Sequence, residues 1–159
     1  TQGSGKSFSM VYFIRKIQRK IPGSFKFVLV TDRDDLEDQL YKTFVRAGLV
    51  EAPQGNATGR REPGSRARDS AHLMAMLRDS SPFVFTLIQK FKTQQRGQPY
   101  PTLTDSADVV VIVDEAHRSQ YKDLGANMRR AMPHASYIAF TGTPLLDAVE
   151  TTREWFGDY

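Results

Sequence analysis

The sequence predicts an α/β protein in which a doubly wound parallel sheet carries helices on both faces. Four short runs are rich in β-branched and aromatic residues, and two of them are almost continuously apolar, which is typical of parallel strands covered on both sides. Segments with helical spacing lie between these runs. The resulting order is helix, strand, helix, helix, strand, strand, helix, strand, which fits such a sheet.

Each predicted element has its own local signal. In the first helix the apolar residues Met10, Ile14 and Ile17 recur at helical spacing before Pro22-Gly23, which stops the helix. The second helix has the same apolar spacing and ends before Gly48. The predicted helices are Ser7–Arg19, Asp35–Ala47, Arg68–Asp79 and Gln120–Met132. The predicted strands are Phe25–Thr31, Pro82–Ile88, Val109–Val113 and Tyr137–Phe140.

Two stretches rich in glycine, proline and polar residues, 52–66 and 92–108, are predicted to be loops. The first contains a cluster of arginines: Arg60, Arg61, Arg66 and Arg68. This cluster fits either a solvated insertion or a contact with a phosphate backbone.

Composition limits the classes of function. With 159 residues, 40% apolar and 25% charged, the chain fits one domain that is neither disordered nor membrane-spanning, and we expect it to be cytoplasmic. Cysteine is absent and only three histidines occur, without ligand spacing, so disulfides are excluded and zinc is not expected. The net charge of +4 is compatible with a polyanionic partner.

The first residues of the chain have the composition of a phosphate-binding loop. Glycines allow successive N–H groups to point at one anion at the start of a helix; Lys6 adds a charge for the β- and γ-phosphates of ATP, and Ser7 offers a hydroxyl to Mg²⁺. The predicted nucleotide-binding residues are Gln2, Gly3, Ser4, Gly5, Lys6 and Ser7. The full pattern needs a strand before this loop, so we expect a sheet without its first strand. A flexible Gly/Ser-rich end is the alternative.

A buried strand that ends in two carboxylates supports the nucleotide interpretation. Ligands bind at the carboxyl ends of parallel strands, so Asp114 and Glu115 should face the same crevice as the loop. Asp114 is expected to hold Mg²⁺, and Glu115 to orient and deprotonate the attacking water. We therefore predict Lys6, Asp114 and Glu115 as catalytic residues. Acids that favour the first turn of the next helix are the alternative.

Several segments in order resemble the motor subunit of type I restriction enzymes, a member of superfamily two of helicases and translocases. Asp114-Glu115-Ala116-His117 is similar to the second signature motif of that superfamily, and Thr141-Gly142-Thr143-Pro144 to the third. The matching segments are TQGSGKS, VLVTDRDDLEDQL, FTLIQKF, VVIVDEAHRSQY, IAFTGTPL and FGDY.

The resemblance implies a RecA-like ATPase lobe, covering residues 1–159, of an ATP-dependent translocase on double-stranded DNA. It further implies a complex with methylation and specificity subunits, a nuclease domain, and a second RecA-like lobe that carries an arginine for the ATP site. We expect residues 1–159 to include neither of these two domains. In this family the third motif links the nucleotide site to nucleic-acid movement. We therefore expect His117 to couple the ATP site to Thr141 or Thr143; a packing histidine is the alternative.

Two polar segments that follow predicted strands are candidate DNA contacts. Arg33 and Thr31 match the position where the family touches the nucleic-acid backbone, although Thr31 or Asp32 equally fits an N-cap for the next helix. The second segment contains Thr86, Gln89 and Lys90, for which a plain surface turn is nearly as good an explanation. Neither segment has the residue set of a major-groove reader, so we predict a sequence-independent grip on the backbone.

Other functions stay open on the sequence alone. The nearest is another superfamily two DNA or RNA helicase lobe, because signature motifs separate these enzymes poorly. A non-catalytic nucleotide- or DNA-binding module is a second, and a kinase with a phosphate-binding loop is a third.

Overall fold

The protein is built around four strands in the part of the chain that the structure, a computed structural model, describes: residues 4–52, 65–93, 97–114 and 121–140. In chain order the elements are α1 (Ser4–Lys20), β1 (Lys26–Thr31), α2 (Asp34–Arg46), α3 (Ser70–Arg78), β2 (Phe83–Leu87), the 3₁₀-helix η1 (Ile88–Phe91), β3 (Val109–Asp114), α4 (Tyr121–Ala131) and β4 (Ser136–Phe140). The helices and strands follow the predicted order. The 3₁₀-helix was not predicted.

All neighbouring strands are parallel, in the order β2-β1-β3-β4. The two central strands, β1 and β3, are buried along nearly their whole length, as their unbroken apolar runs predict. Beside β2, the Ala67 N–H donates to the Phe85 carbonyl at 2.9 Å. Arg66 thereby forms an isolated parallel β-bridge with Phe85, which extends the sheet by one pair of residues. The predicted RecA-like α/β fold class is confirmed.

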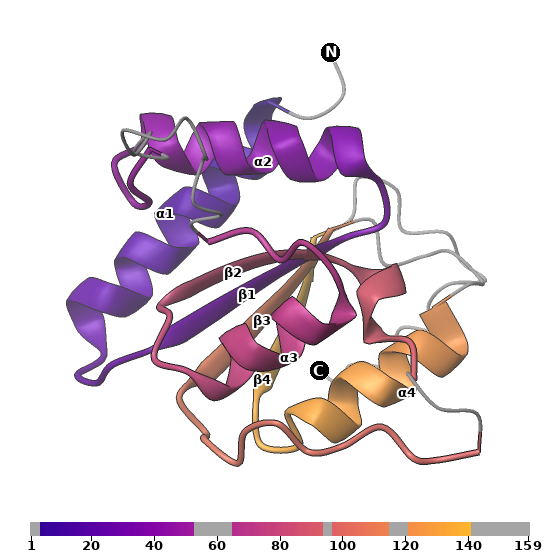
Figure 1. The fold of residues 1–159 in the computed structure, drawn as a ribbon. Helices are drawn as coiled ribbons and strands as arrows, with labels where there is room; N and C mark the ends of the chain where they lie inside the picture. The colour runs from indigo at the N-terminus through magenta and orange to yellow at the C-terminus, as the bar shows by residue number, and fades with distance from the viewer. Residues whose placement is uncertain (1–3, 53–64, 94–96, 115–120, 141–159) are drawn as a thin grey trace, which may run out of the picture.

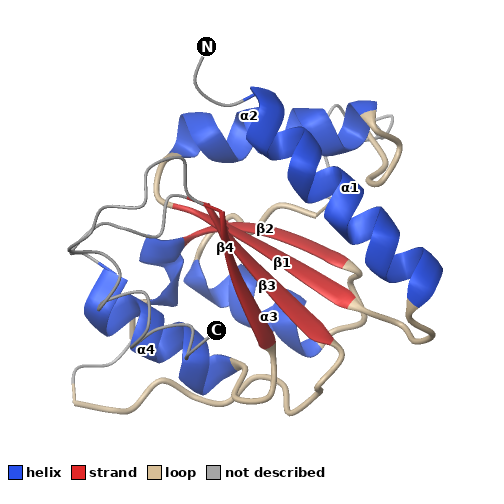
Figure 2. Ribbon diagram, turned by 180° about the vertical axis from the view of Figure 1, so that it is seen from behind, coloured by secondary structure: helices blue, strands red, loops and turns tan. Residues whose placement is uncertain are grey.

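Helices cover both faces of the sheet (Figures 1 and 2). Successive strand residues point to opposite faces. Phe27 and Leu29 of β1 therefore pack in the core under α1 and α2, whereas Val28 and Val30 pack in the core under α3 and α4. Each strand thus connects two apolar layers. Within the described ranges, no helix is long and apolar enough to cross a membrane.

The start of α2 differs from the expectation. Arg33, and not Thr31 or Asp32, occupies the N-cap position; its backbone is extended and no side-chain cap hydrogen bond forms. The Arg33 guanidinium donates two hydrogen bonds to the Asp35 carboxylate, at 3.0 and 2.9 Å. Acidic residues in the first turn also favour the positive end of the helix. Charge in the first turn therefore takes the place of the hydroxyl or carboxylate cap that the sequence predicted.

The end of α3 depends on a lysine from another element. Lys26 begins β1, and its ammonium donates to the carbonyl oxygens of Met76 at 2.6 Å, Leu77 at 3.1 Å and Asp79 at 2.7 Å. These bonds satisfy carbonyls that have no partner within the helix. Burial lowers the pKa of Lys26 from its ordinary value, and the charge of Asp79 opposes that shift. This lysine therefore fixes α3 against the edge of the sheet where the strands begin.

Replacing Lys26 by methionine should loosen α3, because the apolar stem remains while three carbonyl oxygens lose their donor. We expect the free energy of local opening to fall by about 1–3 kcal/mol. Hydrogen exchange of the full-length protein, followed by mass spectrometry, should show faster exchange across residues 70–79. Lys92→Met, at an exposed position, is the matched control and should change the free energy by less than about 0.5 kcal/mol. Equal exchange in both variants would contradict the capping role.

Candidate functional site

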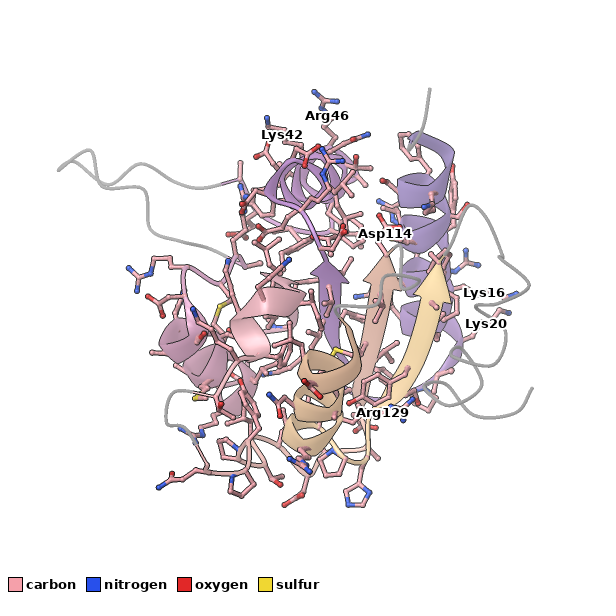
Figure 3. All side chains as sticks on the ribbon, turned by 90° about the vertical axis from the view of Figure 1, so that its right-hand side faces the viewer. Lys16, Lys20, Lys42, Arg46, Asp114 and Arg129 are labelled. Atoms are coloured by element: carbon pink, nitrogen blue, oxygen red, sulfur yellow. The ribbon has the colours of Figure 1, made fainter. Side chains whose placement is uncertain are left out.

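Two charged side chains from distant parts of the sequence meet at the carboxyl edge of the sheet. The Lys6 ammonium, in the first turns of α1, lies 3.1 Å from an Asp114 carboxylate oxygen at the end of β3. Asp114 stands at the tip of the β3 arrow (Figure 3). The side chains are 21% and 15% exposed, so both are partly covered and still reachable from solvent. The predicted convergence of the glycine-rich segment with the end of the buried strand is therefore present.

The local sequence explains why this pair forms. Five buried aliphatic residues hold β3 in the centre of the sheet, and Asp114 is the first position that emerges from the core. On the other side, α1 begins at Ser4 and has no acidic residue in its first turn. A lysine at the positive end of a helix is unfavourable by itself, so the site favours an anion there. In this structure the Asp114 carboxylate supplies that negative charge.

The residues present fit a magnesium-bound nucleotide. A Cβ added at Gly5 would meet no atom within 4 Å, so the space beside the glycine is open. Among the described residues there is no group of three or more histidine and acidic side chains that could hold a metal alone. Mg²⁺ usually binds one or two protein carboxylates together with substrate phosphates, and Asp114 offers one such carboxylate. Ser7, which is nearly buried, and Asp114 are the described residues that would hold it.

Six of the predicted site residues lie outside the described residues, and the structure says nothing of them: Gln2, Gly3, Glu115, His117, Thr141 and Thr143. Of the predicted nucleotide-binding set, Ser4, Gly5, Lys6 and Ser7 all fall in the first turn of α1. The described part of the site therefore contains Lys6, the predicted phosphate contact, together with the metal-binding candidates Ser7 and Asp114, whereas the predicted general base lies outside the described residues.

The predicted DNA contacts divide into buried and exposed residues. Thr31 and Thr86 are fully buried, and their hydroxyls donate to the carbonyls of Arg33 at 3.4 Å and Leu87 at 3.3 Å. Both hydroxyls are enclosed in the core at the carboxyl ends of their strands, Thr31 as the last residue of β1 and Thr86 as the second-to-last of β2. The Arg33 side chain is 55% exposed beside the carboxyl edge, and it remains a candidate for a phosphate contact.

Gln89 and Lys90 have structural partners. The Gln89 side-chain amide donates to the Asp32 carbonyl at 2.8 Å, and the Lys90 ammonium donates to the Ala67 carbonyl. Both bonds join η1 to neighbouring segments at the edge of the sheet. Each side chain therefore uses one donor to hold this edge together.

Arg66 corrects the interpretation of the arginine cluster. Its guanidinium forms ion pairs with Glu37 at 3.4 Å and Asp38 at 3.1 Å, and it lies over the Tyr41 ring, 5.3 Å from the centroid. Arg66 is therefore not freely solvated, because two carboxylates of α2 hold it and balance its charge. The sequence did not indicate that Glu37 is buried, because an acidic residue in the first turn of a helix ordinarily faces solvent.

The comparison with known proteins agrees with the fold. A profile of the SWI2/SNF2 ATPase family matches residues 1–159. The chain therefore belongs to the SWI2/SNF2 ATPase family. Membership implies use of a nucleotide, as the paired Lys6 and Asp114 suggest.

Individual relatives are type I restriction enzyme endonuclease subunits. The chain is 36% identical over 160 residues to the putative type I restriction enzyme MjaIXP endonuclease subunit of Methanocaldococcus jannaschii, covering 99% of the chain and 14% of that protein. It is 34% identical over 177 residues to the HindI endonuclease subunit of Haemophilus influenzae, covering 100% of the chain and 16% of that protein. These matches place the chain in the helicase-like domain of this group, and it spans about one seventh of the relatives' length.

Removing the amide of Gln89 should weaken the junction between η1 and the end of β1. For Gln89→Ala we expect the local free energy of opening to fall by about 1 kcal/mol, because the Asp32 carbonyl loses its donor. Hydrogen exchange across residues 86–91 of the full-length protein measures this change, and Gln39→Ala on the exposed side of α2 is the control. Unchanged exchange in Gln89→Ala would leave its side chain available for another role.

Proposed function

We propose that residues 1–159 form the ATP-binding and ATP-hydrolysing motor lobe of a double-stranded DNA translocase in a type I restriction-modification complex. The observation that carries this proposal is the 3.1 Å contact between Lys6 and Asp114 at the carboxyl edge of the sheet. At this edge the positive end of α1, the Lys6 ammonium and the Asp114 carboxylate lie together. These groups are the ones that phosphoryl transfer needs for charge stabilisation and metal binding.

The roles of the individual residues follow from their chemistry. The Lys6 ammonium, which contacts Asp114 in this structure, would pair with the β- and γ-phosphates of a bound nucleotide, and the N–H groups at the start of α1 would donate to the same anion. Ser7 and Asp114 would hold Mg²⁺, which would supply positive charge to the phosphate oxygens. Glu115 follows Asp114 directly and is proposed to orient and deprotonate the attacking water.

The lobe is proposed to work against a second RecA-like lobe that supplies an arginine to the ATP site. Loss of such an arginine removes a factor of about 10³ to 10⁵ from the rate in related NTPases. The isolated segment of residues 1–159 is therefore expected to hydrolyse ATP slowly. His117, Thr141 and Thr143 are proposed to transmit the state of the nucleotide to the DNA-binding surface.

DNA is proposed to be held through its phosphate backbone, with Arg33 as the exposed contact at this edge of the sheet. Thr31, Thr86, Gln89 and Lys90 would then support the shape of the edge through their bonds to backbone carbonyls. A grip of this kind is independent of sequence. Target choice is therefore assigned to the specificity subunit of the complex, and modification to the methylation subunit.

The names of the relatives favour a motor of a restriction enzyme over an RNA helicase or a kinase. Both of the relatives described above are type I restriction enzyme endonuclease subunits, and neither is named as an RNA helicase or a kinase. A binding module without turnover has no need for a lysine and a carboxylate paired at the nucleotide edge. The proposal therefore rests on the site and the relatives together.

Linear duplex DNA should stimulate ATP hydrolysis by the full-length protein, and Lys6→Ala and Glu115→Gln should each abolish that turnover. Lys6→Ala removes the charge that binds the phosphates, so it should also weaken nucleotide binding. Glu115→Gln should retain binding, because only the group that activates water is changed. Arg130→Ala, an exposed position on α4, is the control and should behave as the wild type. Steady-state ATPase assays and equilibrium nucleotide titration measure both effects.

Two outcomes would contradict the proposal in different ways. Stimulation by RNA but not by duplex DNA would indicate a different superfamily two motor on the same fold. Wild-type turnover in both Lys6→Ala and Glu115→Gln would show that the nucleotide is hydrolysed elsewhere.

A further inference from the structure

The outer face of α1 carries a row of exposed cations and aromatic rings that the nucleotide site does not use. Tyr12, Lys16, Arg19 and Lys20 are exposed on the side of α1 that faces away from the sheet, and Phe8 precedes them on the same side. At about 3.6 residues per turn these positions fall within about a third of the circumference of the helix. We call Tyr12, Lys16, Arg19 and Lys20 the α1 outer face.

The charge on this face is unbalanced. From Ser4 to Lys20 the helix contains no Asp or Glu, so the usual pairing of acids and bases three or four positions apart does not occur. Within the placed part of the chain, Lys16, Arg19 and Lys20 form no ion pair. On the neighbouring α2, by contrast, Lys42 lies 2.6 Å from Asp38. The cations of the α1 outer face therefore present their full charge to solvent.

Part of this charge has a local structural explanation. Arg19 and Lys20 lie in the last turn, where they favour the negative end of the helix. Lys16 lies outside that turn, and Arg15 already donates to the Ala47 carbonyl at the end of α2. The effect of the helix end therefore does not account for Lys16 or for the exposed rings.

Exposed apolar groups are concentrated on the same helix. Among the described residues, the large hydrophobic side chains that are exposed are Phe8 at 51%, Tyr12 at 69% and Ile21 at 50%, and all three belong to α1 or follow it directly. Isolated exposed apolar residues are common, but a group on one helix beside unpaired cations marks an interaction surface.

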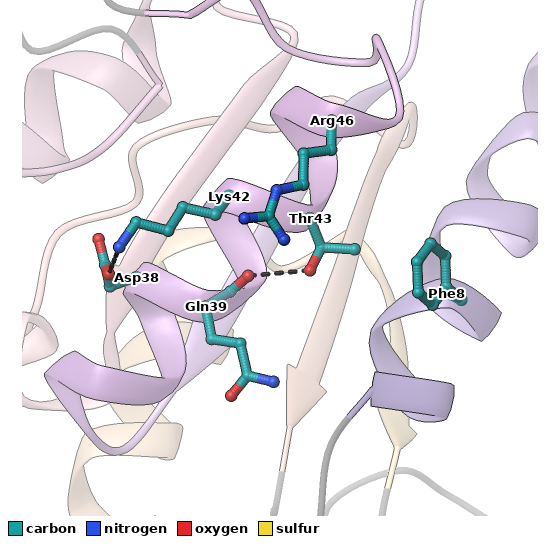
Figure 4. A pocket seen from close by; sticks show the side chains of 6 residues that line it. All are labelled: Phe8, Asp38, Gln39, Lys42, Thr43 and Arg46. Carbon is teal, nitrogen blue, oxygen red and sulfur yellow. Dashed lines mark hydrogen bonds and ion pairs between the residues drawn. The ribbon is translucent and has the colours of Figure 1, made fainter.

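Two shallow hollows adjoin the row. Tyr12, Lys16 and Arg19 line one of them. Phe8 lines the other, facing Lys42 and Arg46 of α2 across it (Figure 4). Figure 3 shows Lys16 and Lys20 together on the α1 side of the molecule, with Lys42 and Arg46 on α2. Because Lys42 is paired with Asp38, Arg46 is the residue of α2 that adds positive charge beside this hollow.

We propose that the α1 outer face binds the phosphate backbone of duplex DNA, as a contact separate from the carboxyl edge of the sheet. This inference rests on the proposed function as a DNA motor. The helix starts at the nucleotide site and runs back along the sheet, so Lys16 to Lys20 lie toward the edge where β1 begins. DNA held there engages the lobe outside the crevice that contains Lys6 and Asp114.

Charge complementarity favours DNA over an acidic protein surface. Lys16, Arg19 and Lys20 lie within about 6 Å along the helix axis, at about 1.5 Å per residue, which spans about two successive phosphates of one strand. Three neighbouring cations with no acidic residue between them match a uniformly charged strand. The Tyr12 hydroxyl is a donor suited to a phosphate oxygen, a contact that fixes position without reading sequence.

The salt dependence of DNA binding tests this surface directly. We would titrate the full-length protein into a labelled linear duplex over a range of salt concentrations and compare wild type with Lys16→Gln/Arg19→Gln. Each phosphate contact contributes about 0.9 to the slope of log K against log salt, so loss of two contacts should lower the slope by about 1.8. Tyr12→Phe should weaken binding without changing the slope, since it removes a neutral donor.

Two control proteins separate local contacts from general charge. Arg78→Gln/Arg130→Gln removes the same charge from exposed positions on α3 and α4, on the opposite face of the sheet, and should keep the wild-type slope. The swap Lys16→Arg/Arg19→Lys keeps both cations and should also keep it. ATPase activity without DNA should equal that of wild type in all of these variants, which shows that each is folded.

Each remaining outcome overturns the proposal. A wild-type slope in Lys16→Gln/Arg19→Gln, or an equal loss of slope in Arg78→Gln/Arg130→Gln, would show that the α1 outer face makes no specific contact with DNA. An unchanged slope together with weaker binding of the methylation or specificity subunits would identify a protein interface instead. A wild-type protein that does not bind duplex DNA at all would overturn the proposed function as well, whereas a change confined to the variants leaves that function intact.

Discussion

The ion pair between Lys6 and Asp114 connects the two halves of the site, and the rest of the arrangement depends on it. Lys6 belongs to the first helix and Asp114 to the third strand, so their contact requires the parallel order that places β3 in the centre of the sheet. The aliphatic run of β3 fixes Asp114 at the point where the strand leaves the core. The positive end of α1 then sets the charge that a ligand of this edge must have.

Much of the fold could be predicted because its signals are local. The apolar run that ends at Asp114 has the pattern of a buried strand, and the spacing of Met10, Ile14 and Ile17 has that of an amphipathic helix. Because the carboxyl ends of parallel strands share one edge, the meeting of Lys6 and Asp114 also followed from these patterns. The 3₁₀-helix Ile88–Phe91 was missed, since four residues are too few to show a period.

The roles of individual polar residues could not be predicted in the same way. Gln89 and Asp32 are 57 positions apart, and Lys26 reaches carbonyls 50 to 53 positions away, so no local pattern reports these bonds. Thr31 and Thr86 have residue types suited to a nucleic-acid contact, but their strands bury them. For the arginine cluster the sequence left a solvated insertion and a phosphate contact open, and it did not indicate the ion pairs of Arg66, because Glu37 and Asp38 are 29 and 28 positions away in the chain. In each case tertiary packing decided which polar groups remain available.

The central claim is that Lys6 and Asp114 share one magnesium-bound nucleotide. An experimental structure of the full-length protein with Mg²⁺ and a non-hydrolysable ATP analogue tests it most directly. The account predicts the phosphates at the start of α1, within hydrogen-bonding distance of the Lys6 ammonium, and the metal beside Ser7 and Asp114. A nucleotide bound at another edge of the sheet, with the 3.1 Å contact between Lys6 and Asp114 retained, would contradict it.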